Sequence, residues 1–160
     1  MKKLIFTLLL ATTFAGASAQ EVYKEIMKLS KAVANDKSKE LEARKIATFK
    51  VDALKYMAMK TMEMMPDSTM NVLDNQAYAL YDFVNLYTKK LNEAKKSKDK
   101  TAVLEIFKNA SLQNKRFNDT DHELAEGYMH AEGFITSFSL DTDWMKATEQ
   151  ARAELRRRKL

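Results

Sequence analysis

Only three glycines and one proline interrupt this chain of 160 residues, so it contains little material for tight hairpins. Beyond residue 20, apolar residues recur at spacings of three and four, which is the period of an amphipathic helix. Alternation with a period of two, which is typical of strands, is scarce. The sequence therefore predicts an all-α fold, an antiparallel helical bundle or stacked helical hairpins with five to six helices in total.

Two of the expected helices are long, at residues 39–65 and 69–96, and each spans about 40 Å. The stretch Pro66-Asp67-Ser68 separates them, and because a short turn favours antiparallel neighbours we expect this pair to be the spine of the molecule. The shorter helices are expected at residues 21–34, 100–113 and 121–135, and from near residue 142 onward. The expected N-caps are Asp67 or Ser68, Asp99, Asp119 or Thr120, and Asp141 or Thr142.

The first 19 residues have the three parts of a secretory signal peptide. Lys2 and Lys3 are followed by an apolar run at residues 4–11 and by the small residues Ala17-Ser18-Ala19. Cleavage between Ala19 and Gln20 would leave residues 20–160 as a single helical domain, periplasmic or secreted. The run is too short to span a bilayer, so no integral membrane segment is expected after cleavage. The alternatives are an uncleaved anchor and a buried first helix.

Composition narrows the chemistry that the chain can carry. It has no cysteine, which removes disulfides, thiolate nucleophiles and thiolate metal sites. The formal charge of +5 falls to +3 once the two lysines of the leader are gone, and acidic residues are interleaved with the basic ones. Together with the expected export, this argues against a nucleic-acid partner.

A methionine-rich stretch at residues 56–70 holds six of the ten methionines. A helical wheel puts Met65 at the centre of the inner face defined by Leu54 and Ala58, and Met59 on the outer side. The favoured interpretation is packing, because methionine fills irregular gaps in cores. Two alternatives remain. The stretch could be an adaptable apolar binding surface, or Met59, Met62 and Met65 could bind Cu(I) or Ag(I) through their thioethers.

No motif for catalysis or for a cofactor emerges, and we expect none. His122 and His130 are about 12 Å apart on one face of the helix expected at 121–135, which is too far for one metal ion. Haem b held by one Met and one His is conceivable, but no spacing selects it. The acidic residues at 119–126 and 141–143 could supply a carboxylate pair, although capping is the favoured role.

The segment 133–144 is too apolar for an exposed loop, yet Ser, Thr and Asp residues interrupt any helical stripe in it. We expect it to run irregularly and to dock on the long helices, because an apolar patch of this size would be a liability in water. Its expected anchors are Phe134, Phe138 and Trp144, with Trp144 largely buried.

Two resemblances accompany these patterns. Residues 94–119 resemble the second helix of a tetratricopeptide repeat and its exit, with Ala102, Phe107, Ala110 and Leu112 near the packing positions of that family and Phe117 where the next repeat would enter. This implies helical-hairpin packing, since the 34-residue period fails in the long helices. The leader resembles those of Bacteroidota, which export many small helical proteins. The stretch Asp67-Ser68-Thr69 resembles an O-glycan acceptor of such proteins, with Ser68 as the glycosylated residue.

Two hypotheses for function follow, and a third, an enzyme, has no motif in its favour. The first is an exported non-enzymatic helical binding or scaffold protein whose partner is a protein, a peptide or a glycan. The second is a soft-metal binding protein that uses the methionine run.

Overall fold

The computed structural model describes residues 22–67, 70–119 and 138–160 of the chain. Within these ranges it is all-helical, without strands, which confirms the predicted fold class. Its five helices are α1 (Val22–Asn35), α2 (Leu41–Met64), α3 (Met70–Glu93), α4 (Ser97–Gln113) and α6 (Trp144–Arg158).

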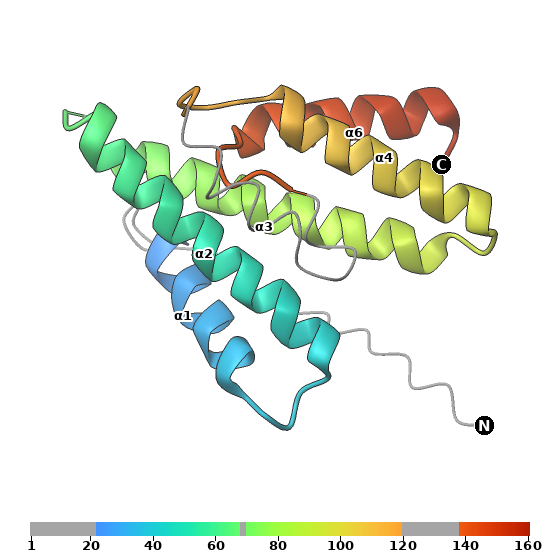
Figure 1. Ribbon diagram of the computed structural model, residues 1–160, viewed down its shortest axis with the longest axis horizontal. Coiled ribbons are helices and arrows are strands. Elements are labelled where there is room, and N and C mark those ends of the chain that lie inside the picture. Colours follow the sequence, from blue (N-terminus) through green and yellow to red (C-terminus); the bar gives the residue numbers. More distant parts are fainter. Residues whose placement is uncertain (1–21, 68–69, 120–137) are drawn as a thin grey trace.

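The helix α3 is the central element, because it packs against each of the other four described helices. α1 and α2 form a hairpin on one side of α3, and α4 and α6 pack together on the other side (Figure 1). The two long helices expected at the centre of the molecule are α2 and α3, and they contact each other. α2 packs more extensively against α1 than against α3, so α3 is the helix that joins the two sides.

Apolar residues at spacings of three and four along α3, from Leu73 to Leu91, lie in the core. Five of these six residues are buried and Leu91 is partly buried, whereas Tyr78 is exposed. The buried members are Leu73, Ala77, Leu80, Val84 and Tyr87. Sequence periodicity therefore identified the inner face of the central helix correctly.

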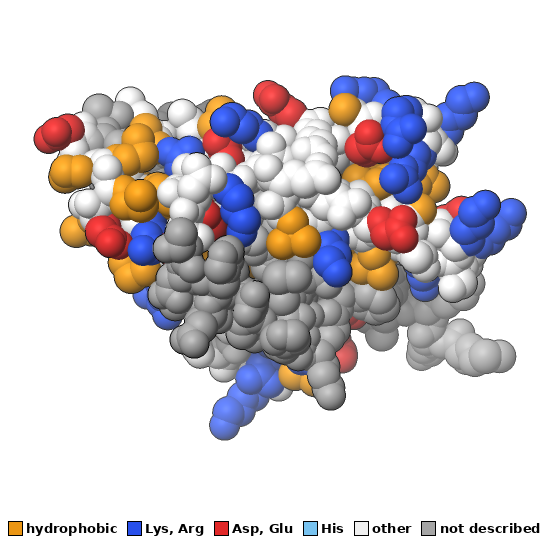
Figure 2. All heavy atoms as spheres, turned by 45° about the horizontal axis from the view of Figure 1, so that its top comes forward, with side chains coloured by type: hydrophobic (Ala, Val, Ile, Leu, Met, Phe, Trp, Pro, Cys, Tyr) orange, Lys and Arg blue, Asp and Glu red, His pale blue; other side chains and the backbone are white. Residues whose placement is uncertain are grey.

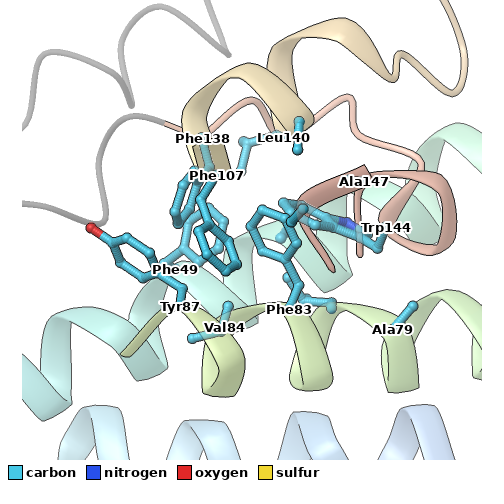
Figure 3. Packing of buried hydrophobic residues seen from close by; sticks show 14 of the residues in the cluster. Phe49, Ala79, Phe83, Val84, Tyr87, Phe107, Phe138, Leu140, Trp144 and Ala147 are labelled. Carbon is cyan, nitrogen blue, oxygen red and sulfur yellow. The ribbon is translucent and has the colours of Figure 1, made fainter. Parts of the chain in front are cut away.

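Aromatic rings from α2, α3, α4, α6 and the segment before α6 form the centre of the core (Figure 3). Phe83 of α3 has its ring centroid 5.3 Å from those of both Trp144 and Phe138, and 5.0 Å from that of Phe107. Phe49 of α2 contacts the Phe138 and Trp144 rings from the other side. The mostly edge-on pairs are the geometry that aromatic quadrupoles favour, and they join α2, α3, α4 and α6 into one core.

The last helix begins one residue later than its expected caps allow. Its N-cap is Asp143, whose side chain accepts a hydrogen bond from the backbone N–H of Lys146, so the assignment of Asp141 or Thr142 was wrong. Gln76 of α3 explains the position of this start. Its amide donates to Asp143 Oδ1 at 2.9 Å and accepts from the Trp144 backbone N–H at 2.8 Å. A buried side chain of another helix thus fixes where α6 begins.

The fourth helix also differs from its prediction. It starts at Ser97, three residues before the expected start, and its N-cap is Lys96, which makes no side-chain capping bond. Asp99, the expected cap, lies in the first turn instead. A carboxylate there is still favourable, because it faces the positive end of the helix dipole.

Candidate functional site

The C-terminal part of α2 extends beyond the helix that pairs with it. α1 has 14 residues and α2 has 24, and the two form an antiparallel hairpin, so the end of α2 continues past the start of α1 (Figure 1). The start of α1 is held by α3, where the Tyr23 backbone N–H donates to Asp74 Oδ1 at 2.8 Å. From residue 62 to residue 67 every residue of the chain is exposed.

Four methionines of this projecting end have exposed side chains, and we call them the Met surface. Their exposed fractions are 50% for Met59, 75% for Met62, 52% for Met64 and 42% for Met65. Hydrophobic side chains gather at the end of the molecule where α2 ends and α3 begins (Figure 2). For these four side chains the packing interpretation of the methionine run is wrong. It holds for Met57, which is 1% exposed and belongs to the core.

For Met59 and Met62 the reason is the orientation of α2 about its own axis, whereas Met64 and Met65 lie where the helix ends and projects past α1. Phe49, Val51, Ala53 and Tyr56 are buried in addition to Leu54, which was predicted to face inward. Phe49 packs on the aromatic core, and the Tyr56 ring lies 6.4 Å from that of Phe117.

These contacts centre the buried face of α2 close to Met57, whereas the wheel had centred it close to Met65. At 100° per residue, Met59 and Met62 are then on the opposite, solvent-facing side.

Charged residues flank the two most outward methionines along the axis of α2. Lys55, one turn before Met59, is exposed, and its Nζ lies 3.7 Å from Asp52 Oδ1. Glu63 and Asp67, which follow Met62, are also exposed. The solvent-facing stripe of α2 therefore has a cation at one end, thioethers in the middle and the Glu63 carboxylate at the other end, with Asp67 beyond the end of the helix.

One lysine connects the Met surface to the turn after α4. Lys60 Nζ lies 3.1 Å from Glu63 Oε2 and 3.3 Å from Asp119 Oδ2, and Tyr56 donates its hydroxyl to the same Asp119 oxygen at 2.8 Å. Hydrogen bonding to Glu63 and then to Asp119 raises the pKa of Lys60. The side chain therefore stays charged at neutral pH and holds the end of α2 against the body of the molecule.

The expected metal ligands are all exposed, Met59 and Met62 on α2 and Met65 as its C-cap. Neighbouring members of this set are three residues apart, a spacing that brings their Cβ atoms to about 5–6 Å on a helix. The outer two point in directions about 120° apart, so α2 alone offers pairs of thioethers rather than a converging triad. In the described part of the chain, no group of three His, Asp or Glu side chains could hold a metal ion.

The segment 133–144, the link before α6, has three expected anchors. Trp144 is fully buried and Phe138 is 1% exposed, both within the aromatic core, and Phe134 is outside the described residues. The cleavage site Ala19 and Gln20, the glycosylation candidate Ser68, and His122 and His130 also fall outside them. Sequence analysis did not single out Met64. At 100° per residue it lies on the same face of α2 as the buried Met57, and it is exposed because the end of α2 projects past the start of α1.

Comparisons with other proteins leave the site to be interpreted from its own chemistry. Neither a family model nor a curated protein nor a solved structure matches this chain. Among the described helices, none has the length and apolar character needed to cross a membrane.

Proposed function

We propose that this protein is an exported, non-enzymatic helical binding domain whose partner docks on the Met surface. The observation that carries the proposal is the exposure of Met59 and Met62, one half and three quarters, on the solvent-facing side of a projecting helix end. Covering such side chains with apolar groups of another molecule is favourable, and unbranched thioethers adapt their shape to a partner. The leader sequence supports export, and the lack of a catalytic motif in the sequence favours binding over catalysis.

The partner that fits best is an amphipathic helical segment of another protein. Exposed methionines recur along recognition surfaces of this kind, on which the apolar face of a helix is laid. The charges at the two ends of the stripe add direction. An acidic residue of the partner would face Lys55 and a basic one would face Glu63 and Asp67, so only one orientation is electrostatically complementary.

A synthetic peptide tests this proposal. The probe is a helical peptide with leucines at spacings of three and four, glutamates at one end and lysines at the other, titrated into the mature protein by calorimetry. We expect binding that is lost in a Met59→Glu/Met62→Glu variant, because charges on the surface would be desolvated on docking. Met145→Glu is the matched control, since Met145 is 46% exposed but lies on α6.

Several outcomes would overturn the proposal. They are the absence of any binding, and binding that the Met59→Glu/Met62→Glu variant retains. If wild-type protein instead dimerises with rising concentration and this variant does not, the surface binds a second copy of the chain and not a foreign helix. Sedimentation velocity of both proteins distinguishes this case.

A second candidate function is soft-metal binding, and one observation favours it. The Met59, Met62 and Met65 side chains all reach solvent, so an incoming Cu(I) or Ag(I) ion could contact adjacent pairs without unfolding the core. Titration with Cu(I) against a chromophoric competitor decides the matter. Stoichiometric binding that disappears when all three are changed to Leu would favour metal binding, and weak binding that this change leaves unaltered would exclude it.

A further inference from the structure

Within the described residues, most of the exposed sulfur lies at the Met surface. The chain has ten methionines and no cysteine, so thioethers are its only sulfur groups. Two-electron oxidants such as hydrogen peroxide attack accessible sulfur, and thiolates normally react before thioethers. Here no thiolate competes, and four of the exposed thioethers lie within seven consecutive positions of one helix end, Met59 to Met65.

The four exposed side chains are separate from the core that holds the molecule together. The core contains Met57, with Met27 packed against it, but none of the four exposed methionines. A sulfoxide at Met57 would place a polar group in a close-packed interior, which destabilises a fold. A sulfoxide at Met62 would instead stand in water. Oxidation at the Met surface therefore changes the polarity of that surface without disturbing the packing that maintains the fold.

We propose that Met59, Met62, Met64 and Met65 form a reversible oxidation site that switches the Met surface from apolar to polar and weakens docking on it. The weakening of docking rests on the proposed function. In each step the thioether sulfur loses two electrons to a peroxide. The O–O bond breaks, one oxygen forms the S=O bond and the other leaves as water. Methionine sulfoxide reductases reverse the step with electrons from a thiol reductant, releasing the oxygen as water.

The site is tested on the mature protein with hydrogen peroxide alone. Peptide mass spectrometry follows the sulfoxide at each methionine, while circular dichroism follows the helices and retention on a hydrophobic column follows surface polarity. We expect the four to oxidise at least about tenfold faster than Met57, with unchanged helicity and earlier elution. Oxidation of Met57 at the same rate, loss of helicity, or unchanged elution would each overturn the oxidation site.

Docking is tested with the same synthetic peptide on reduced and oxidised protein. We expect the affinity to fall roughly tenfold on oxidation and to return after treatment with methionine sulfoxide reductases. The control is a variant with Leu at all four positions, which still contains Met27, Met57 and Met145. Peroxide should leave the affinity of this variant for the peptide unchanged, whatever that affinity is before treatment.

The outcomes separate the two proposals. Equal affinity of reduced and oxidised wild-type protein, or an equal loss in the Leu variant, would overturn regulation through these sulfurs. If reduced protein binds no peptide at all, the proposed function fails, and mass spectrometry with column retention still decides whether the oxidation site exists.

Discussion

The Asp141 carboxylate accepts a hydrogen bond of 2.8 Å from the backbone N–H of Phe117, which ties the link before α6 to the turn after α4. The same carboxylate accepts from the backbone N–H groups of Arg116 at 3.2 Å and Asp119 at 3.0 Å. Asn118, between them, has a φ of 50°, in the left-handed region that Asn tolerates better than most residues. One buried carboxylate therefore accepts hydrogen bonds from three backbone donors of the same turn.

Removing this carboxylate should be costly. We expect Asp141→Ala to lower the free energy of unfolding by about 2–4 kcal/mol, because hydrogen bonds to a charged acceptor are strong and the donors would be left unpaired. Urea denaturation followed by circular dichroism measures the change. Asp67→Ala, at an exposed position, is the control and should stay within about 0.5 kcal/mol of wild type. Equal effects of the two substitutions would contradict the role assigned to Asp141.

The buried Trp144 provides a second test. We expect Trp144→Ala to cost about 3–5 kcal/mol, the usual range for removing a large buried aromatic side chain. Trp144→Phe should cost less, since it keeps a ring among Phe49, Phe83 and Phe138. In wild-type protein the tryptophan emission should shift to longer wavelength on unfolding. Emission at the unfolded wavelength in the native protein, with unchanged stability of Trp144→Ala, would show that the link does not dock.

Stability should rise with pH above neutrality because of Lys50. Its Nζ lies 4.8 Å from the centroid of the Tyr81 ring, and burial lowers its pKa from 10.5 to about 8. Below pH 8 the amine is charged in the folded and the unfolded chain, and the cost of burying that charge is present in full. Between pH 8 and 10.5 the folded chain has released a proton that the unfolded chain still holds, so the free energy of unfolding increases with pH.

Lys50→Met should remove this dependence and stabilise the protein at pH 7. Because the Lys50 side chain keeps partial access to water, we expect a gain of about 1–3 kcal/mol rather than the full effect of the pKa shift. Urea denaturation at pH 7 and pH 9.5 measures both effects. The higher pH is kept below 10 because burial also raises the pKa of Tyr23 and Tyr87. Titration of these tyrosines would lower the free energy of unfolding as the pH rises and so oppose the effect of Lys50. A free energy of unfolding of the wild-type protein that is lower at pH 9.5 than at pH 7 would refute the prediction.

Substitutions of the methionines at the end of α2 should fall into two groups by their effect on the free energy of unfolding. Met57→Ala removes a side chain that is fully within the core, so we expect a loss of about 2–5 kcal/mol. Met62→Ala removes one that is mostly in water and should change stability by no more than about 0.5 kcal/mol. Met65→Leu, which conserves volume at a half-exposed position, should cost less than about 1.5 kcal/mol. A large loss in Met62→Ala would mean that the end of α2 is covered in solution.

Export can be tested independently of the fold. The sequence predicts cleavage between Ala19 and Gln20, so intact-mass analysis of protein recovered outside the cytoplasm should give a chain of residues 20–160. A soluble exported protein that still begins at Met1 would show that the leader is not removed, and an uncleaved anchor would remain to be considered.

Much of the fold was predictable because it depends on local chemistry. The spacing of Leu73, Ala77, Leu80 and Val84 marks the inner face of α3 without reference to any other helix. The caps were less predictable. Asp141 and Asp143 are chemically identical and two residues apart, and only the turn after α4 and the Gln76 amide distinguish which one faces a loop and which one begins α6. The sequence analysis also missed Gln76, because a single polar residue in an apolar stripe carries no signal of its own.

The sequence by itself determined that this chain is helical, that it lacks thiol chemistry, and that its methionines are clustered near the end of one long helix. Only the tertiary structure decided which of those methionines are buried. Phe49 and Tyr56 dock on partners that are distant in sequence, Phe138 and Phe117, and these contacts orient α2 so that Met57 points inward and Met59 and Met62 point outward. A helix of mixed apolar character has several faces that could be buried, and the free energy of packing against its neighbours selects among them.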